Sequence, residues 1–121
     1  MHIQFAELPV ADQDRAKDFY CQRLGCDVVA DQPMGSDGWR WVELRLPGVQ
    51  TNFHFTRRAD DTPSETPCLV LVCDDIEAKV TELRTRGVAF LGEVAPAPYD
   101  PKLLVVEFHD SEGNLIVVSS K

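Results

Sequence analysis

The feature that most constrains the fold of this chain is an internal duplication of a strand, a helix and further strands. The residues up to Val10 alternate between two faces and predict a strand, and Leu69 to Cys73 predicts a second, apolar strand. Aspartates able to cap a helix follow both strands. Matching Leu-Pro-Val-Ala-Asp at 8–12 to Leu-Val-Cys-Asp-Asp at 71–75 places the two helix starts in register. A repeat of this kind predicts two similar modules that pack into one body.

Each predicted helix ends at a glycine, Gly25 in the first copy and Gly87 in the second, because glycine readily adopts the left-handed conformation that closes a helix. Three further strands are expected after each helix, so that each module has the order βαβββ. The strands expected after the first helix are 27–31, 39–46 and 50–56, and those after the second are 88–91, 103–108 and 115–119. The proline-rich residues 95–98 are expected to form a loop.

The length of 121 residues suits a single domain with one core. We expect one domain over residues 1–121, with a first module at about 1–58 and a second at about 67–121. A polar linker without periodicity joins them at about 57–67. The expected fold class is therefore α+β.

The composition narrows the partners and the compartment. A formal net charge of −8 argues against a nucleic-acid partner, because phosphate binding requires a basic surface. No apolar run of about 18 residues and no signal-peptide pattern occurs, so we expect neither membrane insertion nor secretion. The four cysteines form no Cys-x-x-Cys motif, and we expect reduced, buried thiols in a cytoplasmic protein.

A family likeness is carried by the first strand and helix and by the closing hairpin. The residues that carry it are Leu8-Pro9-Val10-Ala11-Asp12, Arg15-Ala16, Asp18-Phe19-Tyr20, Leu24-Gly25 and Phe108-His109-Asp110-Ser111-Glu112-Gly113-Asn114. With them the chain resembles the vicinal oxygen chelate superfamily, which comprises glyoxalases, bleomycin resistance proteins and extradiol dioxygenases. The resemblance implies that two βαβββ modules curl into a half-open barrel of mixed sheets with the helices outside. It also implies a ligand cavity and, as in many members, a homodimer.

Metal-dependent members of that family hold a divalent ion with four inward-facing side chains, one on each of four strands. The resemblance therefore implies four positions in this sequence at which a metal-binding side chain would be required. In this sequence those places fall at Phe5, His54, Cys68 and Val117. Phe and Val cannot bind a metal, and the two remaining residues are too few for a stable catalytic site. We therefore expect no metal and no cofactor.

Strand alternation indicates which side chains line the cavity. Since Val42 and Leu44 are expected to face the helix, their neighbours on the same strand face the opposite way. The residues expected to contact a ligand are Phe5, Trp39, Trp41, Glu43, Asn52, His54 and Glu107. Glu43 and Glu107 occupy equivalent places in the two copies, and converging carboxylates suit an amine or guanidinium ligand or a general base. The two glutamates are equally compatible with two exposed charges that have no role in binding. Trp39 and Trp41 are also compatible with a dimer contact, or with side chains that only shield an apolar sheet from solvent.

Three functions follow from these features. The first is a metal-independent small-molecule-binding protein that resembles the bleomycin resistance branch and sequesters a cationic or aromatic ligand without chemistry. The second is a glyoxalase-type lyase or isomerase with a rearranged metal site at His54 and Glu43 or Glu107. The third is an interaction module whose cavity is filled by its own side chains. We favour the first, a homodimer whose partner is a small molecule that the sequence does not identify.

Overall fold

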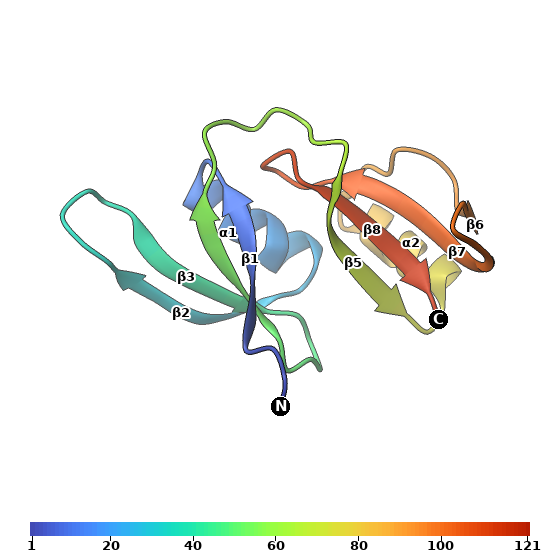
Figure 1. Cartoon of the computed structure of the whole chain (residues 1–121), viewed down its shortest axis with the longest axis horizontal. Helices are drawn as coiled ribbons and strands as arrows, with labels where there is room; N and C mark the ends of the chain where they lie inside the picture. The colour runs from blue at the N-terminus through green and yellow to red at the C-terminus, as the bar shows by residue number, and fades with distance from the viewer. The chain divides into compact units, whose positions relative to one another are not determined.

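The computed structural model describes all 121 residues and divides the chain into two compact units, Met1–Asp61 and Thr62–Lys121. Each unit contains a four-stranded mixed sheet and one helix, in the order βαβββ (Figure 1). The predicted duplication and the α+β fold class are therefore confirmed. The division between the units falls within the segment expected to be a linker. Neither helix is long and apolar enough to cross a membrane.

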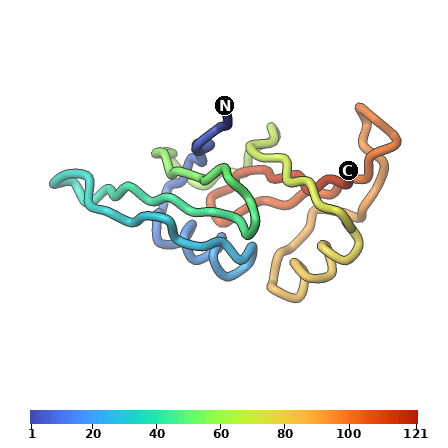
Figure 2. The backbone as a smooth tube through the Cα atoms, turned by 90° about the horizontal axis from the view of Figure 1, so that it is seen from below, coloured from blue at the N-terminus to red at the C-terminus, as the bar shows by residue number.

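In the first unit a helix covers one face of the four-stranded sheet. Its elements are β1 (Phe5–Val10), α1 (Gln13–Arg23), β2 (Asp27–Pro33), β3 (Arg40–Arg45) and β4 (Asn52–Arg57). The strand order is β1-β4-β3-β2, with β1 parallel to β4 and the other neighbours antiparallel. In Figure 2 the coil of α1 lies to one side of the strands of its own sheet. The opposite face of the sheet is therefore left without a helix in this unit.

Local signals explain where α1 begins and ends. The side chain of Asp12 accepts a hydrogen bond from the backbone N–H of Arg15 at 3.0 Å, which satisfies a donor that the first turn leaves free. Gly25 follows the last turn with a φ of 74°, as expected for a glycine that closes a helix. The helix packs Ala16 and Tyr20 onto the sheet, and the Tyr20 ring lies 5.8 Å from that of Phe53. The buried strand residues of this core are Leu8, Val10, Val42, Leu44, Phe53 and Phe55.

The second unit repeats this plan. Its elements are β5 (Pro67–Cys73), α2 (Ile76–Thr85), β6 (Ala95–Ala97), β7 (Asp100–His109) and β8 (Leu115–Ser120), with the strand order β5-β8-β7-β6. Asp75 caps α2 by accepting from the backbone N–H of Ala78 at 3.1 Å. The buried face of this helix consists of Ile76, Val80 and Leu83.

Two predictions in this unit are wrong. Residues 88–91 form no strand, because only an isolated bridge joins Phe90 to Phe108, and the strand of the repeat is instead β6. The prolines of residues 95–98 predict a loop, but Ala95–Ala97 form strand β6. This strand lies at the edge of its sheet. An edge strand tolerates Pro96 because a missing N–H on the open side removes no ladder hydrogen bond.

Strand register shows which residues of the two copies are equivalent. Glu43 of β3 pairs with His54 of β4, and Glu107 of β7 pairs with Val117 of β8. The parallel pairs agree, since His54 lies opposite Glu7 on β1 as Val117 lies opposite Val70 on β5. Glu43 and Glu107 are therefore repeat equivalents, and so are His54 and Val117.

The turn between β7 and β8 is closed by one carboxylate. Oδ1 of Asp110 accepts from the backbone N–H groups of Glu112 and Asn114 at 2.8 and 2.9 Å, and Oδ2 accepts from the Asn114 amide at 3.0 Å. Gly113 has a φ of 80°, which suits glycine. These bonds explain why the motif Asp-Ser-Glu-Gly-Asn marks a hairpin in this sequence.

Candidate functional site

The candidate site lies on the face of the first sheet that α1 does not cover. Val42 and Leu44 are fully buried beneath the helix, so Trp41 and Glu43 between and beside them point to the opposite face. On β4, Phe53 and Phe55 are buried in the same way. The alternation therefore places Asn52 and His54 on the open face, next to Phe5 on the neighbouring strand β1.

Three rings gather on this face and are called the aromatic cluster: Phe5, Trp41 and His54. The imidazole of His54 stacks on the indole of Trp41, with centroids 3.8 Å apart and planes 19° from parallel. Phe5 meets both rings edge-on, at 5.6 Å from Trp41 and 5.2 Å from His54. Contacts of this geometry stabilise by about 0.5–1.5 kcal/mol per pair beyond the area that they bury. The cluster is a preformed aromatic surface that crosses β1, β4 and β3.

A hydrogen-bond chain runs beside these rings and ends on the indole. Nε of Arg45 donates to Oδ1 of Asn52 at 2.7 Å, and the amide of Asn52 donates to Oε2 of Glu43. The other oxygen of Glu43, Oε1, accepts from Nε1–H of Trp41 at 3.0 Å. Asn52 is fully buried, so its amide needs these two partners. Both carboxylate oxygens of Glu43 are engaged within the protein.

His54 differs from its polar neighbours because one of its ring nitrogens has no partner. Nδ1 is shielded from solvent and forms no hydrogen bond. A buried polar atom left without a partner carries a desolvation cost of about 1–3 kcal/mol. The aromatic contacts to Trp41 and Phe5 hold the ring in place without a hydrogen bond at this nitrogen.

Trp39 was expected beside Trp41 but lies elsewhere. It precedes the first residue of β3, and the guanidinium of Arg57 lies over its ring at 4.6 Å from the centroid. Arg57 also pairs with Asp37 in the loop that joins β2 to β3. A surface hollow of about 570 Å³ adjoins this group, and Met34 contributes to its lining. The structure therefore brings together Phe5, Trp41, Glu43, Asn52 and His54, and leaves Trp39 outside the group.

Glu107 belongs to the second unit, where it is partly exposed on β7. Its strand neighbours Val106 and Phe108 are buried, so Glu107 points away from that core as expected. No side chain of the second unit repeats the aromatic cluster, because Val117 stands where the first unit has His54.

The donor set does not fit the metal site that the resemblance implies. Phe5 and Val117 present only carbon and hydrogen, and Glu43 is already bonded to Trp41 and Asn52. Within either unit no three His, Cys, Asp or Glu side chains are grouped in a way that could hold a metal ion. Imidazole and carboxylate ligands in sufficient number are what such an ion requires.

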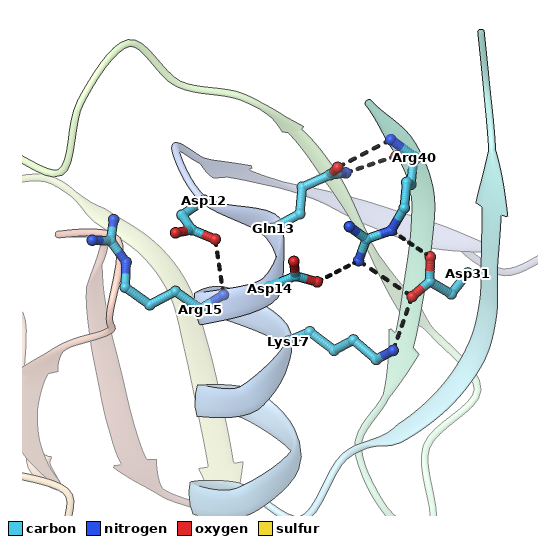
Figure 3. A network of polar contacts seen from close by, with 7 residues as sticks. All are labelled: Asp12, Gln13, Asp14, Arg15, Lys17, Asp31 and Arg40. Atoms are coloured by element: carbon cyan, nitrogen blue, oxygen red, sulfur yellow. Dashed lines mark hydrogen bonds and ion pairs between the residues drawn. The ribbon is translucent and has the colours of Figure 1, made fainter. Parts of the chain in front are cut away.

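A polar network anchors the strand that carries Trp41 and Glu43 to the helix behind it (Figure 3). Arg40, the first residue of β3, donates from Nε to Asp31 on β2 at 2.8 Å and from a terminal nitrogen to Asp14 on α1 at 2.8 Å. Lys17 of α1 donates to the same Asp31 carboxylate at 2.8 Å. The hydrogen bonds from Arg40 and Lys17 to Asp31 lower the pKa of this carboxyl group from 3.8 to about 2.

The backbone of Arg40 is held as well. The side-chain amide of Gln13 donates to the Arg40 carbonyl at 2.7 Å and accepts from the Arg40 N–H at 3.0 Å. Gln13 is buried and was not expected to have a role. No sequence signal pointed to this network, since its members are polar residues spread over α1, β2 and β3.

The chain is similar to proteins of one family. Residues 2–118 match the family model described as the Glyoxalase/Bleomycin resistance protein/Dioxygenase superfamily. The protein YetH of Bacillus subtilis (strain 168) is 32% identical over 111 residues, covering 90% of this chain and 89% of that protein. Among solved structures, TnmS3, an antibiotic binding protein from Streptomyces sp. CB03234, is 33% identical with a TM-score of 0.76, covering 99% of this chain and 95% of its own. A superfamily member from Sphaerobacter thermophilus DSM 20745 is 26% identical with a TM-score of 0.81, covering 100% and 98%.

Proposed function

Since this chain belongs to the glyoxalase/bleomycin resistance protein/dioxygenase superfamily, we propose that it binds an aromatic small molecule and sequesters it without a metal ion. The observation that carries the proposal is the aromatic cluster on the uncovered face of the first sheet. Trp41 is stacked and edge-packed there by His54 and Phe5, and Phe5 is still 36% exposed. An exposed, ordered aromatic surface is what a flat ligand requires for stacking.

The likeness to known proteins supports a binding role. TnmS3, which shares 33% of its residues with this chain over nearly the full length, is described as an antibiotic binding protein. Phe5 and Val117 stand where a metal-dependent member of the family has metal-binding side chains. Their presence favours binding of a small molecule over metal-assisted catalysis in this protein. Sequestration also predicts that a bound compound is recovered chemically unchanged, which mass spectrometry of the extracted ligand checks.

The contacts that we propose for the ligand are the rings of Phe5, Trp41 and His54. Glu43 and Asn52 lie behind Trp41 in the hydrogen-bond chain, and Glu107 belongs to the other unit. Contact of Glu107 with a ligand therefore stays a prediction from the sequence. A homodimer, also proposed, is checked by sedimentation of the purified protein with and without ligand.

The two tryptophans make a decisive titration possible, because each can be observed alone. Trp39→Phe leaves Trp41 as the only indole, and Trp41→Phe is the matched variant that leaves Trp39. A panel of neutral and cationic polycyclic aromatic compounds is added to each protein, and tryptophan emission is followed. We expect saturable quenching in the Trp39→Phe protein and at least about a tenfold weaker apparent affinity, which is about 1.4 kcal/mol, in the Trp41→Phe protein.

Two results would contradict the proposal. Quenching that is saturable only in the Trp41→Phe protein would move the site to Trp39 and the hollow beside Met34. The absence of saturable quenching by any member of the panel in the unmodified protein would remove the binding role for the aromatic cluster.

A further inference from the structure

The position of Glu43 bears on the kind of ligand that the aromatic cluster takes. We infer that Glu43 is a positioning residue for Trp41 and does not bind the ligand, and that the site accepts a flat aromatic compound without charge. The inference rests on the proposed function and narrows its ligand class. It departs from the sequence-based expectation that Glu43 captures an amine or a guanidinium group.

Both oxygens of the Glu43 carboxylate already accept hydrogen bonds within the protein. Oε1 accepts from the Trp41 indole at 3.0 Å, and Oε2 accepts from the amide of Asn52. An ionised carboxylate only accepts hydrogen bonds and has about four lone-pair sites, so a ligand ammonium would have to share these oxygens with the Trp41 indole and the Asn52 amide. Displacing the Asn52 amide would leave a fully buried polar group without its partner.

A cation lies at the other end of the same hydrogen-bond chain. The side-chain carbonyl oxygen of Asn52 accepts a hydrogen bond from Nε of Arg45 at 2.7 Å. Glu43 and Arg45 therefore belong to a single hydrogen-bond chain, in which the positive charge of Arg45 opposes the attraction of Glu43 for a cation. The surface that remains for a ligand is the carbon of Phe5, Trp41 and His54, with the exposed carboxylate of Glu7 opposite His54 at its side.

Two contacts fix the orientation of Trp41. The hydrogen bond to Glu43 fixes the direction in which the indole N–H points, and stacking on His54, with centroids 3.8 Å apart, fixes the plane of the ring. A ring that is already fixed loses little freedom when a ligand stacks on it, which favours affinity. Glu43 thus contributes to binding through Trp41, and its negative charge is not what the ligand recognises.

A spectroscopic experiment tests the positioning role without any ligand. In the Trp39→Phe background the indole N–H of Trp41 gives the single indole cross-peak of a ¹H–¹⁵N spectrum. We expect Glu43→Ala to move this peak towards the position of a free indole, and Glu43→Gln to retain most of the hydrogen-bonded shift because its carbonyl oxygen still accepts. Glu7→Gln removes an exposed charge from β1 opposite His54 and is the matched control, which should leave the peak unmoved. An indole peak that is the same in the Glu43→Ala protein as in its parent would overturn the positioning role.

A matched pair of ligands tests the charge class. Acridine, which is uncharged at mildly alkaline pH, and N-methylacridinium, which is a permanent cation, have the same fused rings. By equilibrium dialysis we expect acridine to bind more tightly than the cation, to keep its affinity within about threefold in Glu43→Gln, and to lose about tenfold in Glu43→Ala. Because Glu43→Gln preserves size and one acceptor, it keeps the test informative even if the alanine variant folds poorly.

Each alternative has its own signature. Tighter binding of N-methylacridinium that is lost selectively in Glu43→Gln and retained in Glu7→Gln would make Glu43 a ligand-binding residue and overturn the inference. Equal losses in both charge-removing variants would assign cation binding to the two carboxylates beside the aromatic cluster, Glu7 and Glu43, which also overturns it. If neither compound binds and no other member of the fluorescence panel does, the ligand class falls together with the proposed function, while the indole spectrum still decides the role of Glu43.

Discussion

Replacing Asp31 by Asn is expected to lower the stability of the first unit at neutral pH. Asp31 on β2 accepts from Arg40 on β3 and from Lys17 on α1, both at 2.8 Å, so one carboxylate joins three elements (Figure 3). Asparagine fills nearly the same space but removes the charge that both cations face. The variant therefore tests the network and disturbs the packing of the core very little.

The magnitude follows from the pKa of Asp31, which the bonds to Arg40 and Lys17 lower from 3.8 to about 2. A shift of nearly two pKa units corresponds to about 2 kcal/mol of folding free energy at neutral pH. The side chain of Asp31 is 23% exposed, and those of Arg40 and Lys17 are 27% and 31% exposed, so solvent screening removes only part of this. We expect the free energy of unfolding to fall by about 1–2 kcal/mol in Asp31→Asn.

The same shift predicts a dependence on pH. The folded-state pKa of Asp31 lies below the unfolded value, so the stabilisation is fully present above the unfolded value of 3.8 and is lost as the pH falls towards about 2. The difference in stability between the unmodified protein and Asp31→Asn should therefore be constant near neutral pH and shrink across that acidic window. Comparing two proteins cancels the titration of the other carboxylates.

Urea denaturation followed by tryptophan emission measures this difference, because both tryptophans belong to the first unit. Asp61→Asn is the control, since Asp61 pairs with Arg15 at 3.6 Å with side chains 60% and 43% exposed. Exposed pairs contribute about 0–1 kcal/mol, and we expect a change below about 0.5 kcal/mol. The reasoning is refuted if Asp31→Asn is no less stable than the Asp61 control, or if its deficit stays the same down to the acidic end of the window.

Three further outcomes are expected. Burial raises the pKa of the Cys26 thiol to about 12, so iodoacetamide at mildly alkaline pH should leave Cys26 unmodified in the native protein and alkylate it in urea, as peptide mass spectrometry checks. Asp110→Ala removes the acceptor for two backbone N–H groups of the β7–β8 turn and should destabilise the second unit by about 2–3 kcal/mol in thermal or urea unfolding followed by circular dichroism. Asp75→Ala removes the N-cap of α2 and should cost about 1 kcal/mol in the same assay. Asp74→Ala, at an exposed ion pair with Lys121, should cost clearly less, and equal losses would contradict the capping role.

Much of the fold was predictable because it depends on short-range patterns. Helix caps at Asp12 and Asp75 and closing glycines at 25 and 87 act within one turn, so the order of neighbouring residues is sufficient to find them. Alternation along β3 and β4 likewise separated the buried Val42 and Phe55 from the open face. The misplaced strand of the second unit has a different cause. Whether 88–91 or 95–97 pairs with β7 depends on the path of the chain after α2, and Pro96 is acceptable only because its strand is at the edge.

The candidate site divides in the same way. Alternation by itself placed Trp41, Glu43, Asn52 and His54 on one face, because the period of two is a property of the extended backbone. Trp39 has the same parity as Trp41, yet it lies outside β3 and packs on Arg57, because parity has no meaning beyond the end of a strand.

Partners across the sheet were decided by tertiary structure alone. That Asn52 bonds Glu43, and that His54 stacks on Trp41, depends on the register of β3 against β4, which no local pattern specifies. The sequence by itself determined the duplicated βαβββ order, the helix ends and the faces on which the residues of β3 and β4 lie. Only the tertiary structure decided that an apparent anionic site is a carboxylate already bonded to its own neighbours, because the bond from Asn52 crosses between two strands whose register the sequence does not specify.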